Sequence, residues 1–286
     1  MESVLLQNTA QSLVKGFVGN NKKSLGQNFL VDDSVTRAIA QHAGFFNPTD
    51  ILEIGPGAGS LTLELLKLNV RYHAIEKDDR CCDYLKSVFG SLNHVDIRQG
   101  DVLDSVLPAC CFSSELRTLV VSNLPYNVAT QIYFTLVDQH LPLIGMVLMF
   151  QKEVAERFIA APGTKAYGIL SIFGNYYHHI DELIEVSPDS FHPRPKVQSM
   201  VLSFRPKAPV LSAELESIFR SLVKHAFAMR RKTLLNSLSG YRGATREDIA
   251  CIFEKAGLST TLRAENLSLE NYISLTYLFA EFNKEA

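Results

Sequence analysis

Apolar residues in the first part of the chain occur in short continuous runs, and a segment with helical spacing follows nearly every run. The runs are rich in Val, Ile and Leu, which is typical of strands buried on both faces. The intervening segments place apolar residues three or four positions apart, as in a helix with one buried face. The predicted strands are 51–54, 72–75, 95–98, 119–122 and 146–150, and the predicted helices are 61–68, 82–89, 129–137 and 154–161. This repeated order predicts an α/β fold built on a doubly wound, mostly parallel sheet.

The later part of the chain changes its pattern. Residues 182–186 and 197–204 indicate two more strands, which makes seven in all, and the alternation in the second suits a late strand near the sheet edge. Two prolines within 205–209 indicate a linker. Three predicted helices follow at 211–225, 245–256 and 267–282. We therefore expect a main domain at 1–207 and a small all-helical domain at 208–286.

A length of 286 residues favours a main domain with a smaller one beside it, and a hydrophobic content of 47% is enough for a sizeable core. No apolar stretch approaches the roughly 18 residues that span a bilayer, and no signal peptide precedes the first strand. A soluble cytoplasmic protein with no membrane partner is the expectation. The five cysteines form two adjacent pairs, at 81–82 and 110–111, plus Cys251, a spacing that suits neither zinc ligands nor a disulfide framework. We expect no metal.

Charge is unevenly distributed, although the net value is only −2. Segment 190–246 holds eleven lysines and arginines against Glu214 and Glu216, so it carries +9 and the remainder carries −11. A basic face beside an acidic remainder is expected of a protein that binds phosphates in one place and a small cofactor in another. Solvated helix faces are the alternative interpretation.

The glycine-rich turn after the first predicted strand is a candidate cofactor site. Gly55, Gly57 and Gly59 let the backbone approach a ligand closely, and Glu76, at the end of the second strand, can accept both ribose hydroxyls. Dinucleotide enzymes share these features. Asp101, placed to accept from an adenine amine, and Asn123 favour S-adenosylmethionine instead. The alternative for Glu76 and Asp101 is a strand-end residue that merely caps the next helix. The predicted cofactor site also includes the adjacent residues Lys77 and Val102.

The tetrapeptide 123–126, Asn-Leu-Pro-Tyr, is the candidate reacting centre. The Asn123 side-chain oxygen and the Pro125 carbonyl can accept the two N–H bonds of a conjugated base amine, while Tyr126 stacks on the base. Such a base must first be unstacked and swung into the pocket. Phe191 is the candidate for the opposite face of the base, with a loop anchor packed on the core as its alternative role.

Six segments together resemble the bacterial small-subunit rRNA adenine dimethyltransferases of the KsgA (RsmA) type. The resemblance covers nearly the whole chain, and no departure is visible at the cofactor or target motifs. The matching segments are 23–30 (KSLGQNFL), 53–62 (EIGPGAGSLT), 123–129 (NLPYNVA), 150–155 (FQKEVA), 191–197 (FHPRPKV) and 227–236 (FAMRRKTLLN).

The resemblance implies a Rossmann-like methyltransferase fold and the dimethylation of two adjacent adenosines in the loop of the 3′-terminal 16S rRNA hairpin. S-adenosylmethionine is the implied donor, with S-adenosylhomocysteine as product, and a late 30S assembly intermediate is the implied partner. Segment 1–30 is expected to close over the cofactor, with Asn28 and Leu30 in contact. We expect a monomer that does not act on DNA. The expected RNA-binding residues are Lys22, Lys23, Arg194, Lys196, Arg230, Arg231 and Lys232.

Three other functions remain open at this point. Relatives that dimethylate large-subunit rRNA share residues 123–126, although Gly26 and the match over 230–236 favour the small-subunit type. A non-catalytic binder on the same fold, such as an assembly checkpoint or a transcription factor, is disfavoured by the intact Asn123, Pro125 and Tyr126. DNA adenine methylation is the third.

Overall fold

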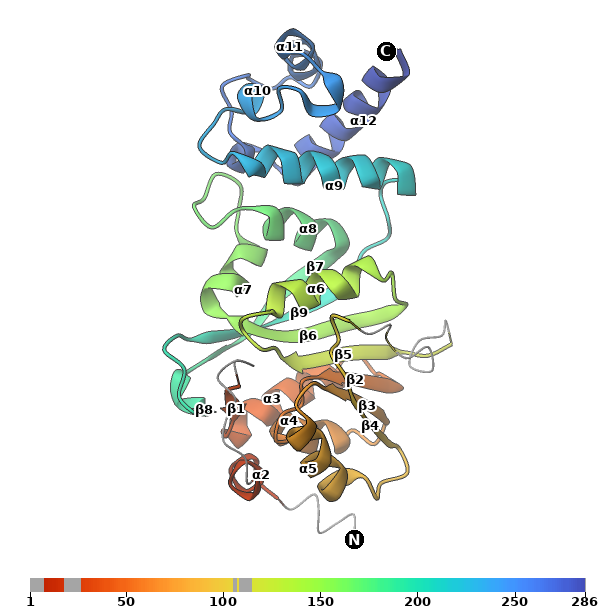
Figure 1. Cartoon of the computed structure of the whole chain (residues 1–286), viewed down its shortest axis with the longest axis vertical. Coiled ribbons are helices and arrows are strands. Elements are labelled where there is room, and N and C mark those ends of the chain that lie inside the picture. Colours follow the sequence, from red (N-terminus) through yellow and green to blue (C-terminus); the bar gives the residue numbers. More distant parts are fainter. Residues whose placement is uncertain (1–7, 18–26, 105–106, 108–114, 286) are drawn as a thin grey trace. The chain divides into compact units, whose positions relative to one another are not determined.

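The computed structural model describes residues 8–17, 27–104, 107 and 115–285. Contacts divide the chain into two compact units, and the chain passes between them three times (Figure 1). Unit 1 comprises residues 1–155 and 181–206, and unit 2 comprises 156–180 and 207–286. No helix in the described part of the chain is long and apolar enough to cross a membrane.

Unit 1 is built on a seven-stranded sheet. Across the sheet, the first five strands are parallel to one another, and the sixth pairs antiparallel with the fifth. This arrangement confirms the predicted doubly wound, mostly parallel sheet. In order across the sheet, the strands are β4 (Val95–Gln99), β3 (Arg71–Glu76), β2 (Asp50–Ile54), β5 (Thr118–Asn123), β6 (Leu143–Gln151), β9 (Ser199–Pro206) and β7 (His178–Val186).

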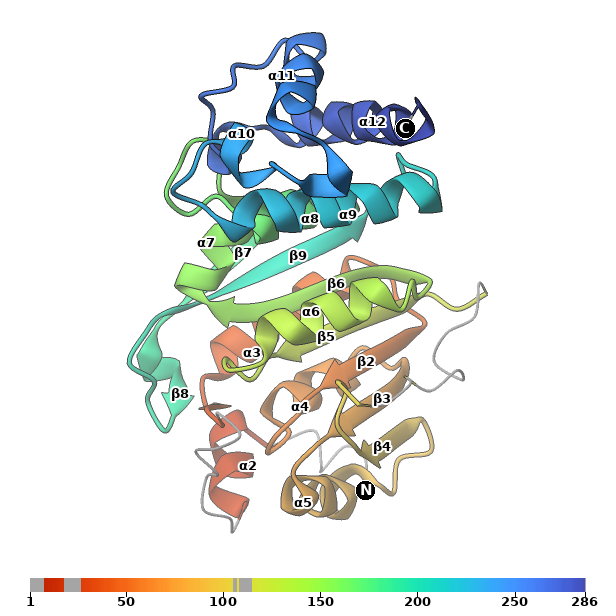
Figure 2. The same ribbon diagram turned by 45° about the horizontal axis from the view of Figure 1, so that its top comes forward.

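The sheet order reverses its direction between β2 and β5. From β2 the chain moves outward through β3 to β4, and it then returns to the other side of β2 to form β5 and β6. Because such crossovers are right-handed, helices α4 (Ser60–Leu66) and α6 (Ala129–Asp138) belong on opposite faces of the sheet. Figure 2 shows α6 in front of β5 and β6, and α3 (Asp33–Gly44) behind them. Ligands bind at such a reversal, outside the carboxyl ends of the strands.

Two more helices and a small two-stranded ladder complete unit 1. They are α2 (Ala10–Gly16), α5 (Asp79–Phe89) and a two-stranded ladder in which β1 (Phe29–Leu30) pairs antiparallel with β8 (Phe191–His192), just after the short helix η3 (Pro188–Ser190). The main hydrophobic core joins the sheet to the helices on one face, and it includes Ile51, Leu63, Tyr72, Phe89, Val121 and Val147.

Unit 2 is helical and holds its own aromatic core. Phe219 of α9 packs against Phe173 and Tyr176 of α8, with ring centroids 5.8 and 4.5 Å apart. Tyr241 meets Phe279 of α12 edge-on at 5.2 Å. Its elements are the second half of α7 (Lys152–Ile159), α8 (Ile169–Tyr177), α9 (Ala213–Ala228), α10 (Leu234–Ser237), η4 (Tyr241–Gly243), α11 (Arg246–Lys255), η5 (Ala264–Asn266) and α12 (Leu269–Glu285).

The chain changes units after residues 155, 180 and 206, and the domain boundary expected between 207 and 208 lies beside the last of these three points. Segment 156–180 also belongs to unit 2 by its contacts, because the apolar side chains of α8 are buried against α9. The sequence pattern missed α8 altogether. Its residues, ILSIFGNYY, are apolar or aromatic nearly all round, so they show no polar face from which a helical period could be recognised.

Candidate active site

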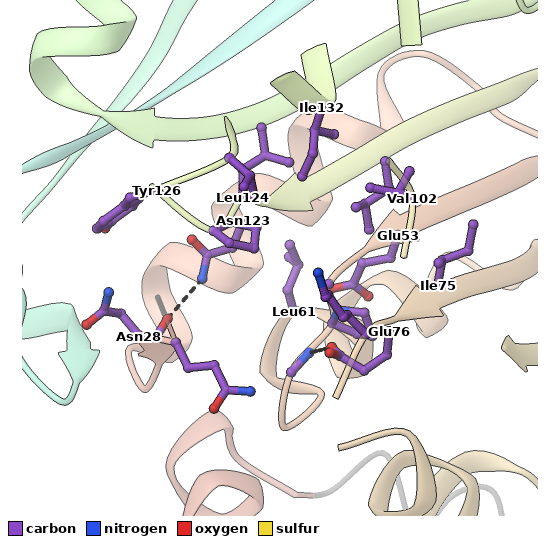
Figure 3. Close-up of a pocket in the computed structure, with 18 of the residues that line it drawn as sticks. Asn28, Glu53, Leu61, Ile75, Glu76, Val102, Asn123, Leu124, Tyr126 and Ile132 are labelled. Atoms are coloured by element: carbon purple, nitrogen blue, oxygen red, sulfur yellow. Dashed lines mark hydrogen bonds between the residues drawn. The ribbon is translucent and has the colours of Figure 1, made fainter. Parts of the chain in front are cut away.

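A cavity opens at the carboxyl ends of β2, β3, β4 and β5, where the sheet order reverses (Figure 3). It measures about 1100 Å³ when the solvent at its open mouth is included. Small-molecule sites typically have roughly 300–1,000 Å³, so a nucleoside-sized cofactor and part of a second ligand fit. The predicted residues that line it are Asn28, Leu30, Gly55, Gly57, Glu76, Lys77, Asp101, Val102, Asn123, Pro125 and Tyr126.

The turn that follows β2 has a backbone conformation that requires glycine. Gly55, Gly57 and Gly59 have φ angles of 64°, 61° and 86°, in the left-handed region that other residues rarely adopt. A Cβ at Gly57 would also lie 2.8 Å from the Phe29 ring. The turn therefore brings bare backbone to the cavity wall, with the N-terminal segment packed closely against it.

Glu76 stabilises this turn from the end of β3. Its carboxylate is buried and accepts hydrogen bonds from the Gly57 amide at 2.9 Å and the Asp78 amide at 2.8 Å (Figure 3). Burial raises the pKa of Glu76, and these two amides oppose that effect. Each carboxylate oxygen retains a second lone pair, so the group can still accept from a diol placed in the cavity.

Asp101 lines the cavity two residues after the end of β4 and forms an ion pair with Lys77. Its second oxygen accepts the Leu103 amide at 3.0 Å. Partial burial opposes ionisation of Asp101, but the hydrogen bonds from Lys77 and from the Leu103 amide, together with the charge of Lys77, outweigh it and lower the pKa of the carboxyl. Asp101 is therefore an ionised acceptor at the cavity rim.

Glu53 is a cavity residue that the sequence analysis did not identify. It is 1% exposed, near the end of β2, and its Oε2 accepts hydrogen bonds from Tyr72 at 2.5 Å and Thr62 at 2.8 Å. Burial raises the pKa of its carboxyl to about 7, although both hydroxyls favour the ionised form. An acid inside the apolar run 51–54, two positions before Gly55, was the available signal.

Asn123 ends β5, and its carboxamide points into the mouth of the cavity, on the side where Tyr126 lies (Figure 3). Its Nδ2 donates to the Asn28 carbonyl at 3.3 Å. Its Oδ1 accepts no hydrogen bond from the part of the chain that the structure describes. The N-terminal segment thus engages the donor end of the amide and leaves the acceptor end toward the cavity.

Pro125 and Tyr126 complete the tetrapeptide on the cavity wall. The Pro125 carbonyl accepts the Val128 amide at 3.1 Å, which leaves one lone pair for a further donor. The Tyr126 hydroxyl is hydrogen-bonded to Ser199 at 2.6 Å, and the ring is half-buried. An amide oxygen, a carbonyl oxygen and an aromatic ring therefore converge at one end of the cavity.

Phe191 does not lie where the sequence analysis placed it. Its ring is 3% exposed, belongs to the main hydrophobic core and does not line the cavity. The reason is the β1–β8 ladder, which pairs Phe191 with Leu30 and turns its side chain inward. The alternative role, a loop anchor on the core, is the one that the structure supports.

The expected RNA-binding residues differ in their surroundings. Arg230 donates to the carbonyls of Lys165 and Tyr167, at 3.2 and 3.0 Å, and forms an ion pair with Glu265 at 3.2 Å, all within unit 2. Its guanidinium therefore holds a loop of its own unit, while the side chain stays about half exposed. Arg194 pairs with Asp189 at 2.7 Å.

Arg231, Lys232 and Lys196 are exposed, as a phosphate contact requires. Lys22 and Lys23 lie outside the described residues. Across the described ranges, no three His, Cys, Asp or Glu side chains are grouped as metal ligands are.

Comparison with known proteins identifies the family. A sequence model described as "Ribosomal RNA adenine dimethylase" matches residues 18–281. The chain belongs to this family. Two curated members named "Ribosomal RNA small subunit methyltransferase A" are similar to it along almost their whole length. The Geobacter metallireducens protein is 41% identical over 89% of this chain and 94% of its own, and the Bacillus mycoides protein is 36% identical over 96% and 97%.

Solved structures share the rRNA adenine dimethylase fold with this chain. A dimethyladenosine transferase from Plasmodium falciparum superposes with a TM-score of 0.75 at 24% identity, covering 90% of this chain and 98% of its own. The 23S rRNA methyltransferase ErmE superposes with a TM-score of 0.67 at 22% identity, covering 88% and 100%. At these identities the likeness concerns the fold alone.

Proposed function

We propose that this chain transfers methyl groups from S-adenosylmethionine to the exocyclic amines of adenosines in small-subunit rRNA. The family match and the names of the curated relatives support this activity. The observation that carries the proposal is that Asn123, Pro125 and Tyr126 line the same cavity as the glycine turn and its neighbouring acids.

The cofactor end of the cavity suits a nucleoside with a charged tail. Glu76 has lone pairs for the two ribose hydroxyls, and ionised Asp101 can accept from the adenine amine. Asn28 and Leu30 supply part of the wall from the N-terminal segment, and Lys77 and Val102 extend it beside the acids. S-adenosylmethionine, when bound, supplies an electrophilic methyl group and leaves as S-adenosylhomocysteine.

The reacting end of the cavity suits a flat base that carries an amine. The lone pair of an adenine amine is delocalised into the ring, so the amine is a weak nucleophile in its planar form. Asn123 Oδ1 and the open lone pair of the Pro125 carbonyl can accept its two N–H bonds and favour a pyramidal nitrogen. The Nδ2–Asn28 contact sets the orientation of the Asn123 amide before the base arrives.

The target adenosine must leave its stack to reach these groups. Unstacking costs a few kcal/mol, and stacking on an aromatic side chain returns about 1–3 kcal/mol. Tyr126 is the aromatic residue at this end of the cavity. Unpaired loop adenosines need the least unstacking, which agrees with the proposed target, two adjacent adenosines in the loop of the 3′-terminal 16S hairpin. We place the reaction in the cytoplasm, in a late 30S assembly intermediate, with the protein acting as a monomer.

One experiment tests the proposed function directly. Pure protein is incubated with methyl-labelled S-adenosylmethionine and small ribosomal subunits that lack the modification, and the rRNA is digested and analysed for dimethyladenosine. Labelled dimethyladenosine in the 3′-terminal fragment is the expected result. Parallel reactions with large-subunit rRNA and duplex DNA separate the competing substrates, and absence of the nucleoside where a known dimethyltransferase produces it would refute the proposal.

A further inference from the structure

The hydroxyl of Tyr126 is held by a residue that lies far away in the sequence. Tyr126 Oη and Ser199 Oγ are 2.6 Å apart, a short distance for two neutral hydroxyl groups. Tyr126 follows β5, and Ser199 is the first residue of β9, so the bond joins two separate elements of unit 1. It connects the aromatic residue of the reacting end to the interior of the sheet.

Ser199 is itself firmly placed. Its exposed fraction is 0%, and it pairs with Gln151 of β6 in the antiparallel ladder. Beside it, the Lys152 amide donates to the Gln198 carbonyl at 2.9 Å. The Ser199 hydroxyl is therefore a fixed point that belongs to the sheet, whereas Tyr126 sits in a turn at the cavity wall.

A tyrosine ring needs more than its backbone to define its position. The χ1 torsion swings the ring axis, which runs from Cβ to Oη, and the ring of Tyr126 is only partly buried. A hydrogen bond at Oη fixes the far end of that axis. The bond itself covers neither face of the ring, since it is made at the edge of the ring.

We propose that Ser199 is a positioning residue for methyl transfer, and that its hydroxyl holds the Tyr126 ring where the face of the target adenine must stack. This inference rests on the proposed function. It assigns the phenol hydroxyl to an anchoring bond, with the substrate contacting the ring face. Burial raises the pKa of Tyr126, so the hydroxyl keeps its proton at neutral pH and is not a base for the amine.

Two substitutions remove the same bond from its two ends and keep both side chains nearly the same size. Ser199→Ala leaves the Tyr126 ring without its anchor, and Tyr126→Phe leaves an equivalent ring without a hydroxyl. Methylation of unmodified small subunits is measured with pure enzyme, and kcat and KM for subunits are determined separately. Titration with S-adenosylmethionine and thermal unfolding are measured in parallel.

Each single variant should lose about 3- to 10-fold in kcat/KM for subunits, the range that corresponds to one ordinary hydrogen bond. The double variant should be no slower than either single one, because the bond is already lost. Ser199→Thr, which restores the hydroxyl, should recover most of the activity. Cofactor affinity should stay near the wild-type value in all four variants.

Three outcomes would overturn the inference. They are wild-type kinetics in Ser199→Ala, losses that multiply in the double variant, and a loss of cofactor affinity and folding stability that accounts for the whole kinetic defect. If Tyr126→Phe alone were impaired, the hydroxyl would contact substrate and the inference would also fall. A wild-type protein that makes no dimethyladenosine would refute the proposed function instead, so the two failures can be told apart.

Discussion

The cavity of unit 1 and the basic residues Arg231 and Lys232 of unit 2 place their polar groups in opposite surroundings. At the cavity, Glu53 and Glu76 are almost fully buried, and hydrogen bonds from neighbouring groups fix each carboxyl. In unit 2, Arg231 and Lys232 are exposed. A small planar ligand needs acceptors that are placed before it arrives, whereas an RNA backbone needs positive charge within reach of its phosphates. We therefore expect turnover to depend on single hydrogen-bonding atoms at the cavity of unit 1, and RNA affinity to depend on the net positive charge of unit 2.

The largest effect is expected from Asn123→Ala. The change removes the Oδ1 acceptor, and loss of one preorganised hydrogen-bonding group at a reacting centre lowers turnover by about 10²–10³-fold. Dimethyladenosine formation on unmodified small subunits is the measurement. Gln131→Ala, an exposed amide on α6, is the matched control and should keep its activity. Wild-type turnover in Asn123→Ala would remove the contrast between the two regions.

The buried carboxyl of Glu53 should make folding stability depend on pH. Its pKa of about 7 in the folded protein exceeds the ordinary 4.5, so the folded state binds more protons than the unfolded chain between these values. Stability should therefore fall by about 3 kcal/mol as pH rises through this window, and level off above it.

Glu53→Gln should flatten this part of the profile in chemical denaturation at a series of pH values. Glu182→Gln on β7, at an exposed carboxyl, is the matched control and should follow the wild-type curve. Parallel curves for all three proteins would mean that Glu53 stays ionised in the folded state. The cavity would then hold a buried negative charge at neutral pH. The carboxyl of Glu53 would be charged like the exposed side chains of unit 2, and the two regions would differ less than proposed.

Within unit 2, Arg230 differs from Arg231 because its side chain is hydrogen-bonded to other residues of the unit. Because its guanidinium binds two carbonyls and Glu265, Arg230→Ala should lower the free energy of unfolding by about 1 kcal/mol, a modest value that reflects its partial exposure. Arg231→Ala, which changes the same charge at the next position, should leave stability unchanged. Equal stability losses in the two variants would show that position along the segment, and not the bonds of Arg230, decides the effect.

The smallest effect is expected from Arg231→Ala with Lys232→Ala. If these side chains contact phosphates, the plot of log affinity for small-subunit rRNA against log salt concentration should become shallower by about 1 for each lost contact. Lys255→Ala, an exposed charge at the end of α11, is the control for a simple loss of charge. An unchanged slope in the double variant would exclude Arg231 and Lys232 from the RNA interface.

Patterns that are local in the sequence predicted most of the fold and part of the site. The apolar runs located the strands, and the order of strands and helices predicted the crevice at their carboxyl ends. Gly55, Asp101 and Asn123 could be placed at the cavity because each ends a strand or follows one within two residues. These inferences need only the neighbours of a residue along the chain.

Features that depend on distant partners were out of reach of the sequence. The inward turn of Phe191 depends on its pairing with Leu30, and the engagement of Arg230 depends on carbonyls in a loop some sixty positions earlier. Ser199 occupies an ordinary alternating strand, so nothing local marks it as the partner of Tyr126. Glu53 was visible as a residue, but its raised pKa follows from complete burial beside Tyr72 and Thr62.

The interleaving of the two units has a consequence for synthesis on the ribosome. Phe173 and Tyr176 emerge well before Phe219, which covers them in the finished protein. At roughly 5–20 residues per second, these aromatic side chains remain uncovered on the nascent chain for a time on the order of seconds. Strand β9 is likewise translated only after the passage through α8, so the sheet lacks an interior strand until then. This enzyme should depend on chaperone protection during translation more than a protein whose domains follow one another along the chain.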